Sequence, residues 1–350
     1  MPGLGSSRQV TARSALATGF VGAVLFVAAC DSGTSSVDVR SIDPTDSTQA
    51  PDITEPVDTI GSPETTDRGA PVVPTGSVRF AVIGDFGTDC CGEADVAALV
   101  DQWQPQFIVT TGDNRYDALS PDRAIGQYYA DYIGNYDGEY GAGAEVNRFF
   151  PAPGNHDYSS RGGFDRYLDY FDLPGEGIET SGTSGNERYY DFVQGPVQFF
   201  VVNTNEEEPD GVAEDSAQAD WLRTNLAAST APWQIVVTHH PPLSSGHHGS
   251  IEEVQWPFVE WGADVVISGH EHSYERLMVG DVPLIVNGSG GQKLRPKGTQ
   301  EHEESQIFYG EDYGALFVEG CAGQLTFEFD SVSDGTVDQF TVGDGVCPPQ

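Results

Sequence analysis

The chain has 350 residues, enough for one large domain or two modest ones with a packed core. It carries 54 acidic residues against 16 basic ones, and its formal net charge at pH 7 is -38. Such a surface repels polyanions, which disfavours nucleic acid and anionic membrane surfaces as partners. A solvated acidic coat of this kind suits salty or acidic surroundings.

The first 29 residues have the features of a secretory signal. Arg8 and Arg13 precede an apolar stretch at 15–29 that is short for a membrane span. The stretch ends in Val-Ala-Ala before Cys30, which resembles the lipobox of bacterial lipoproteins. We therefore expect an exported protein, anchored at the cell surface or in the periplasm through a lipidated Cys30. An ordinary signal peptide and full secretion are the alternative.

The next segment, residues 30–76, is rich in Ser, Thr, Pro and Asp and has no apolar periodicity. Because this composition cannot bury a core, it predicts a disordered tether. The composition changes abruptly at Ser77. We expect one catalytic domain over residues 77–342 and a short C-terminal tail over 343–350.

Four cysteines remain besides Cys30, an even number that favours disulfides in an exported chain. They allow three pairings. We favour Cys321 with Cys347, which would join the tail to the last strands and leave Cys90 and Cys91 as a vicinal pair.

The predicted elements begin with a buried strand at 78–83, a helix at 93–103 and a strand at 107–110. These three segments form a βαβ unit with acidic residues after both strands, where open α/β sheets place their sites. Further strands are predicted at 189–193, 197–203, 234–238 and 265–268, with a helix at 216–228 before the third of them. The segments 282–287, 315–319, 325–329 and 337–342 are strand-like and suggest antiparallel completion of a second sheet.

Five short polar motifs follow apolar runs. They are Gly84-Asp85-Phe86-Gly87, Gly112-Asp113-Asn114-Arg115-Tyr116, Gly154-Asn155-His156-Asp157, Val236-Val237-Thr238-His239 and Gly269-His270-Glu271-His272. Each supplies oxygen or imidazole donors, as a metal site on the ends of several strands requires. A lone Gly-Asp is more often a turn that caps a helix. Here the preceding glycine is expected to allow a sharp turn that projects Asp85 or Asp113 into a cleft.

This ordered set resembles the calcineurin-like metallophosphoesterase superfamily. Tyr116, four positions after Gly112, resembles the purple acid phosphatase branch, in a bacterial form with a single catalytic domain. The resemblance implies an α/β fold, a four-layer α/β/β/α sandwich of two packed mixed sheets with flanking helices. It also implies a hydrolase, an acid phosphatase-like metallophosphoesterase.

The resemblance further implies a binuclear metal centre in which Asp113 bridges the two ions. The first metal would be held by Asp85, Asp113, Tyr116 and His272, and the second by Asp113, Asn155, His239 and His270. A phenolate and carboxylates suit Fe(III), whereas imidazoles and an amide oxygen suit Fe(II), Zn or Mn. If Tyr116 is only a packed aromatic residue, the centre is an ordinary divalent one.

Three further histidines have roles implied by the resemblance. His156 would contact the phosphoryl group and stabilise the transition state. His247 and His248 follow a Pro-Pro pair, where relatives place substrate histidines, and one could protonate the leaving oxygen; a surface pair without a role is the alternative. His240 has no assignment, and His239 is preferred as the ligand because it completes Val-x-x-His. Glu271 is expected to point away from the metals.

The expected reaction is hydrolysis of a small-molecule phosphomonoester by in-line attack of a metal-bound hydroxide. A phosphodiesterase or nucleotidase on the same scaffold is an alternative, because variable loops decide substrate choice. A non-catalytic surface lipoprotein that binds phosphate or metal is a second alternative. We expect a monomer that touches the membrane only through Cys30.

Overall fold

The structure is a computed structural model that describes residues 76–89 and 92–347. The predicted signal peptide, almost all of the predicted tether, Cys90 and Cys91 lie outside the described residues. Export, lipidation and the vicinal cysteine pair therefore stay predictions. Among the residues that are described, no helix has the length and apolar character needed to cross a membrane.

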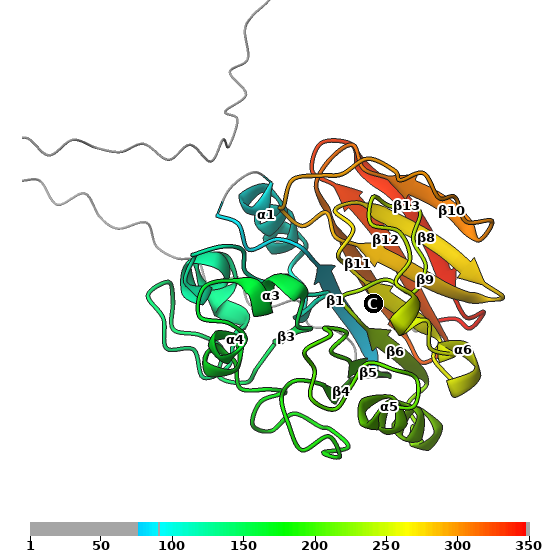
Figure 1. The fold of residues 1–350 in the computed structure, drawn as a ribbon, viewed down its shortest axis with the longest axis horizontal. Helices are drawn as coiled ribbons and strands as arrows, with labels where there is room; N and C mark the ends of the chain where they lie inside the picture. The colour runs from blue at the N-terminus through cyan, green and yellow to red at the C-terminus, as the bar shows by residue number, and fades with distance from the viewer. Residues whose placement is uncertain (1–75, 90–91, 348–350) are drawn as a thin grey trace, which may run out of the picture. The chain divides into compact units, whose positions relative to one another are not determined.

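Six strands form the first sheet in the order β13-β12-β11-β1-β2-β3 (Figure 1). They are β1 (Ser77–Ile83), β2 (Phe107–Thr110), β3 (Phe149–Pro151), β11 (Gly314–Cys321), β12 (Gln324–Ser331) and β13 (Gly335–Val342). β1, β2 and β3 run parallel, whereas β11, β12 and β13 are antiparallel. Helix α1 (Glu93–Trp103) joins β1 to β2, which confirms the predicted βαβ unit.

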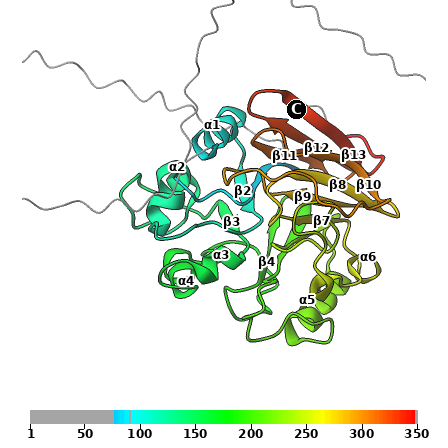
Figure 2. The same cartoon turned by 45° about the horizontal axis from the view of Figure 1, so that its top comes forward.

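Seven strands form the second sheet in the order β10-β8-β9-β7-β6-β5-β4 (Figure 2). They are β4 (Tyr190–Gln194), β5 (Val197–Val201), β6 (Trp233–Val237), β7 (Val265–Ser268), β8 (Tyr274–Val279), β9 (Val282–Asn287) and β10 (Ser305–Tyr309). β5, β6, β7 and β9 are parallel neighbours, and the edges are antiparallel. The remaining helices are α2 (Gln127–Tyr129), α3 (Asn155–Ser159), α4 (Asp165–Tyr170), α5 (Ala217–Ala228) and α6 (Phe258–Trp261), with short π or 3₁₀ turns at Asp122–Gly126, Ala130–Tyr132 and Glu252–Val254.

The last strands divide between the sheets, which corrects the sequence-based prediction. β9 joins the second sheet beside β7, whereas β11, β12 and β13 extend the first sheet through β1. The alternating pattern of a strand reports which face is buried, but it does not report the neighbouring strand. β3, β8 and β10 were not predicted as strands.

An aromatic core joins the two sheets. The ring centroids of Phe80 on β1 and Phe199 on β5 lie 5.1 Å apart. Phe150 on β3 and Phe192 on β4 stack at 3.8 Å, and Phe107 on β2 contacts both sheets. All five rings are buried. Burial of apolar area stabilises this core, and the edge-to-face and stacked ring pairs add further stabilisation. The core therefore holds the two sheets face to face.

Helices cover the two outer faces. On β6, Ile235 and Val237 pack in the core between the sheets, whereas Val236 packs on the other side with Leu222 of α5. Trp103 of α1 stacks on Phe317 of β11 at 4.6 Å. Figure 1 shows α5 beside β5 and β6, and Figures 1 and 2 show α1 beside β11. The arrangement is the predicted sandwich of two mixed sheets with flanking helices.

The C-terminal tail is joined to the first sheet by the favoured disulfide, Cys321 with Cys347, with Cα atoms 5.6 Å apart. The indole Nε1 of Trp233, on the second sheet, donates to the carbonyl of Cys321 at 2.8 Å. The tail therefore closes the end of the sandwich that lies at the start of β6.

Candidate metal centre

The candidate site is built where strands of both sheets end. Asp85 follows β1, Asp113 follows β2, His239 follows β6 and His270 follows β7. Backbone hydrogen bonds connect these loops: the amide of Asp85 donates to Gly112 O at 3.0 Å, and the amide of Gly269 donates to His239 O at 2.9 Å. Motifs far apart in the sequence are thereby held in one place.

The sharp turns are taken by the functional residues and, before Asp113, also by the expected glycine, since Gly112 has a φ angle of 94°. Asp85, Asp113 and His270 have positive φ angles of 55°, 51° and 69°. Non-glycine residues rarely adopt this region, and such conformations gather at functional sites. Gly84 serves a different purpose from the expected turn, because a Cβ there would lie 1.9 Å from the Thr111 hydroxyl oxygen. Glycine is thus required for close approach of the two loops.

Oxygen donors dominate one half of the site, which we call the acidic half: Asp85, Tyr116 and His272. The Tyr116 hydroxyl donates to Asp113 Oδ2 at 3.0 Å and lies 3.3 Å from Asp85 Oδ1 and 3.4 Å from His272 Nε2. Nδ1 of His272 lies 2.8 Å from the Lys293 carbonyl, which can only accept, so this nitrogen carries the proton. Nε2 is left as a ligand atom.

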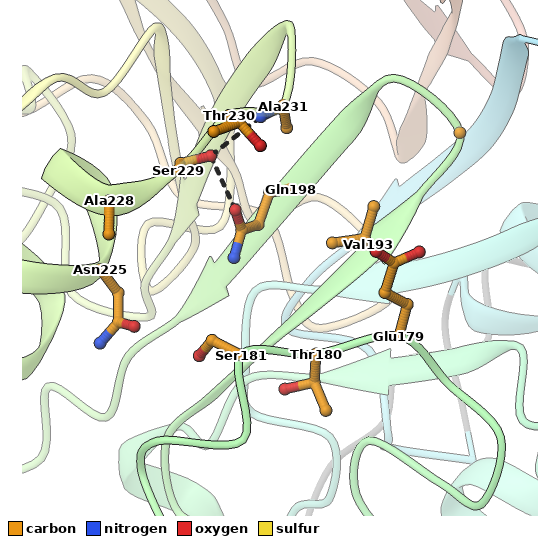
Figure 3. Close-up of a pocket in the computed structure, with 11 residues that line it drawn as sticks. Glu179, Thr180, Ser181, Val193, Gln198, Asn225, Ala228, Ser229, Thr230 and Ala231 are labelled. Carbon is orange, nitrogen blue, oxygen red and sulfur yellow. Dashed lines mark hydrogen bonds between the residues drawn. The ribbon is translucent and has the colours of Figure 1, made fainter.

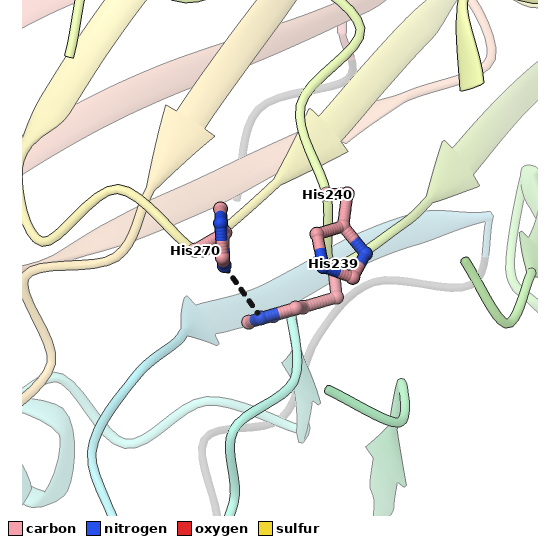
Figure 4. A group of neighbouring side chains, drawn as sticks. All are labelled: His239, His240 and His270. Atoms are coloured by element: carbon pink, nitrogen blue, oxygen red, sulfur yellow. Dashed lines mark hydrogen bonds between the residues drawn. The ribbon is translucent and has the colours of Figure 1, made fainter. Parts of the chain in front are cut away.

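Imidazoles dominate the other half, which we call the imidazole half: Asn155, His239 and His270. Nδ1 of His239 donates to the Thr111 carbonyl at 2.8 Å, which leaves Nε2 facing Asn155 Oδ1 at 3.0 Å. Nδ1 of His270 lies 3.1 Å from the same amide oxygen and 3.3 Å from His239 Nε2. Figure 4 shows the rings of His239 and His270 turned toward one another.

Asp113 lies between the two halves. Its Oδ2 accepts from Tyr116, whereas its Oδ1 lies 3.4 Å from His239 Nε2 and accepts from the backbone amide of His156 at 2.7 Å. The carboxylate is 1% exposed. One side chain therefore presents an oxygen to each half, the arrangement that a bridging ligand requires.

Burial shifts the pKa values of the acidic ligands and of the histidines in opposite directions. It raises the pKa of Asp85 well above the ordinary value, and the nearby Asp113 carboxylate adds to the effect. It likewise raises the pKa of Tyr116, with further contributions from both carboxylates. Burial lowers the pKa of His239, and it lowers the pKa of His270 to about 2. Desolvation penalises every charged form, and cations bound here would favour ionised oxygens beside neutral imidazoles.

The donor atoms are also close enough to share ions. Two groups have all their ligand atoms within 4.8 Å of one another: Asp85 with Asp113 and His239, and His239 with His240 and His270. Carboxylates, a phenol, imidazoles and an amide oxygen in one buried cluster fit a binuclear site.

His240 lies nearer to this centre than the sequence indicated. Its ring centroid is 4.6 Å from that of His270, while its Nδ1 lies 2.9 Å from the Thr204 hydroxyl (Figure 4). Burial lowers the pKa of His240 to about 4. His239 is the histidine whose Nε2 lies 3.0 Å from Asn155 Oδ1 and 3.4 Å from Asp113 Oδ1, which favours the predicted register.

His156 lies against the acidic half. Its ring centroid is 4.3 Å from that of Tyr116. The start of α3, which carries it, is held by Asp157, whose Oδ2 accepts from the Gly154 amide at 2.8 Å and from the Asn114 side chain at 3.0 Å. Asp157, the last residue of the Gly154-Asn155-His156-Asp157 motif, thus positions His156.

The two loop histidines differ. The ring centroid of His248 lies 4.5 Å from that of His270, whereas the ring contact of His247 is with His248 at 5.2 Å. Glu271 organises this loop, because its Oε1 accepts from the amides of His248 at 2.6 Å and Gly249 at 2.7 Å. The sequence did not show that Glu271 holds the backbone of this loop.

Comparison with known proteins decides the family. Residues 78–274, more than half of the chain, match the model of calcineurin-like phosphoesterases. The chain belongs to this family. Similar proteins include Arabidopsis thaliana purple acid phosphatase 17, 26% identical over 255 residues that cover 64% of this chain and 72% of the relative. Arabidopsis thaliana purple acid phosphatase 4 is 25% identical over 296 residues, covering 75% and 83%.

Solved structures show the same fold. A purple acid phosphatase from yellow lupin seeds has a TM-score of 0.61 at 19% identity and covers 77% of this chain and 54% of its own. Plasmodium GAP50, described as an anchor in the inner membrane complex, has a TM-score of 0.57 at 19% identity, covering 77% and 90%. Family membership and the ligand clusters make this protein a phosphoester hydrolase of a family with binuclear metal sites.

Proposed function

We propose that this protein is a binuclear metal-dependent phosphatase that hydrolyses phosphomonoesters. The observation that carries the proposal is the position of Asp113, which offers one oxygen to the acidic half and one to the imidazole half. Similarity to proteins named purple acid phosphatases supports the choice of monoester substrates.

The acidic half with Asp113 would hold the first metal, and the imidazole half with Asp113 the second. The phenol of Tyr116 favours Fe(III) in the first position, and the imidazoles favour Fe(II), Zn or Mn in the second. Bound metals would polarise the phosphoryl group and supply a nucleophile from water at neutral pH.

The chain's own residues would position the phosphoryl group and its leaving oxygen. The amide of His156 is bonded to Asp113, so its imidazole is held beside the metals where charge develops on the transferring oxygens. His248 would protonate the leaving oxygen, because its loop is fixed by Glu271 and its ring reaches His270. We prefer His248 to His247 for this role.

We also propose export, with Cys30 as the lipidated N-terminus. The basis is the apolar run that ends at Val-Ala-Ala-Cys30. Mass spectrometry of the membrane-extracted protein is expected to find a diacylglyceryl-modified Cys30. An unmodified N-terminus elsewhere, with all protein in the medium, contradicts the anchor.

The activity is tested by phosphate release from an aryl phosphate and aryl alcohol release from a matched aryl diester. The protein is loaded with iron alone or with iron plus zinc or manganese, and metal content is measured on the same samples. We expect turnover of the monoester to exceed that of the diester. The opposite preference indicates a phosphodiesterase, and metal-loaded protein that turns over neither is a binding protein.

A further inference from the structure

A cavity of about 410 Å³ lies between the loop that follows β2 and the loop that follows α3. Its lining includes Arg115, Arg161, Arg166 and Ser120 and contains no acidic residue. The chain as a whole has 54 acidic and 16 basic residues. The local sign of charge is thus reversed at this cavity, which favours an anion as its occupant.

Arg115 forms the fixed part of the cavity. It is 3% exposed, and its Nη1 donates to the carbonyls of Leu119 at 3.2 Å and Arg161 at 2.9 Å. A guanidinium stays protonated when it is buried, so a positive charge is held between the loops. Among residues 76–89 and 92–347, no carboxylate forms a hydrogen bond or ion pair with it.

Arg161 and Arg166 supply the open donors. Both side chains are exposed, and within the described part of the chain neither guanidinium forms an ion pair. Arg188 and Arg276, by contrast, are neutralised, because Arg188 pairs with Glu208 and Arg276 pairs with Asp338. The donors of Arg161 and Arg166 are therefore available for an anion.

The chain connects the cavity to the proposed phosphoryl site through short segments. Arg115 is next to the proposed ligand Tyr116, and the Ser160 hydroxyl donates to the Arg115 carbonyl at 3.1 Å. Arg161 follows α3, the short helix that begins at Asn155. A helix of this length spans only about 8 Å, so one substrate could reach both places.

We propose that the arginine cavity binds a second phosphate group of the substrate, so that the preferred substrates are small molecules with two phosphates. This inference rests on the proposed phosphatase activity. Guanidinium groups match phosphate oxygens in geometry as well as charge. The volume also lies within the range of about 300–1,000 Å³ that small-molecule sites occupy.

A second cavity of similar size lacks the basic residues that distinguish the arginine cavity. It has a volume of about 290 Å³ and lies beside β4, β5 and the end of α5 (Figure 3). Its lining includes Glu179 and no cation, and its Gln198 accepts a hydrogen bond from Ser229 at 2.7 Å. With a carboxylate and no cation in its lining, this cavity does not favour an anion.

The test compares α,ω-alkane bisphosphates of increasing length with matched monophosphates that carry a hydroxyl in place of the second phosphate. For the wild type we expect kcat/KM to be on the order of tenfold or more higher for the best bisphosphate than for its partner. The double variant Arg161→Ala/Arg166→Ala should bring this ratio close to one. Arg223→Ala, which removes an exposed arginine on α5, is the matched control and should keep the wild-type ratio.

Titration calorimetry with the same pairs measures binding separately from turnover. The inference is supported if the wild type binds the bisphosphate more tightly than its partner and the double variant loses this preference. If the protein then hydrolyses neither compound, only the phosphatase proposal fails. Equal treatment of the two compounds by the wild type overturns the inference. So does a preference that survives in the double variant.

Discussion

The two halves of the metal centre are built from opposite chemistry. Asp85 and Tyr116 in the acidic half become more costly to ionise when buried, and burial raises the pKa of each. His239 and His270 in the imidazole half become more costly to protonate, and burial lowers the pKa of each. A cation would offset the cost of burial in both halves, since it favours ionised oxygens and neutral imidazoles alike.

The two halves nevertheless orient one histidine each in the same way, through a hydrogen bond from Nδ1 to a backbone carbonyl. A backbone carbonyl accepts from Nδ1 of His239 and from Nδ1 of His272, and each leaves Nε2 free. The carbonyls belong to Thr111 and Lys293, from loops of different sheets. The ligand geometry therefore depends on how the sheets pack.

The largest effect is expected from Asp113→Ala, because this carboxylate serves both halves. We expect loss of both metals and a fall in kcat/KM by a factor of about 1,000 or more. Metal analysis and kinetics on one preparation measure it, with Asp101→Ala, an exposed carboxylate on α1, as control. Retention of one full equivalent of metal would show that the halves bind independently.

A smaller loss is expected from His156→Ala, which lies beside the acidic half without being a proposed ligand. Both metals should remain, while kcat falls on the order of 100-fold, the scale seen when one charge stabiliser is removed. The same metal and kinetic measurements decide the point. If the variant sheds metal as Asp113→Ala does, His156 is a ligand.

Tyr116→Phe distinguishes the halves by metal type. A phenolate bound to Fe(III) gives a charge-transfer band, so the iron-loaded wild type should be coloured and the variant colourless. Three other proposed donors remain, and metal loss should be less than in Asp113→Ala. Visible spectra at matched iron content test this, and an unchanged band in the variant removes Tyr116 from the ligand set.

The smallest effect concerns Glu93, a buried acid outside the metal centre. Burial raises the pKa of Glu93 to about 8 from an ordinary value of 4.5, against hydrogen bonds from the amides of Thr88 and Asp89. The folded state holds this proton more tightly than the unfolded state. Its contribution to stability is full below pH 4.5 and is lost as the pH rises through 8.

Glu93→Gln keeps an acceptor for the two amides and removes the titration. The free energy of unfolding of the wild type, minus that of the variant, should fall on the order of 2–4 kcal/mol between about pH 5 and pH 8. Denaturant titrations of metal-loaded protein measure it. Parallel pH profiles would show that Glu93 is ionised in the folded state at neutral pH.

Much of the fold could be predicted because apolar periodicity is local. The helix over 93–103 and the strand over 107–110 were placed with their observed bounds. β8 and β10 were missed, since their polar residues weaken the strand pattern, and the sheet of β11 was wrong because pairing partners are not encoded in periodicity. The family and the motif residues could be recognised because ligand types and spacings are themselves sequence features.

The sequence by itself determined which side chains can bind metal and the order in which the strands deliver them. Only the tertiary structure decided that Glu271 holds the His248 loop and that Arg115 joins Arg161 at one cavity. These contacts join residues distant in the chain, and no local pattern reports them. The physical reason is that packing of the two sheets, not the motifs, sets the distances between the strand ends.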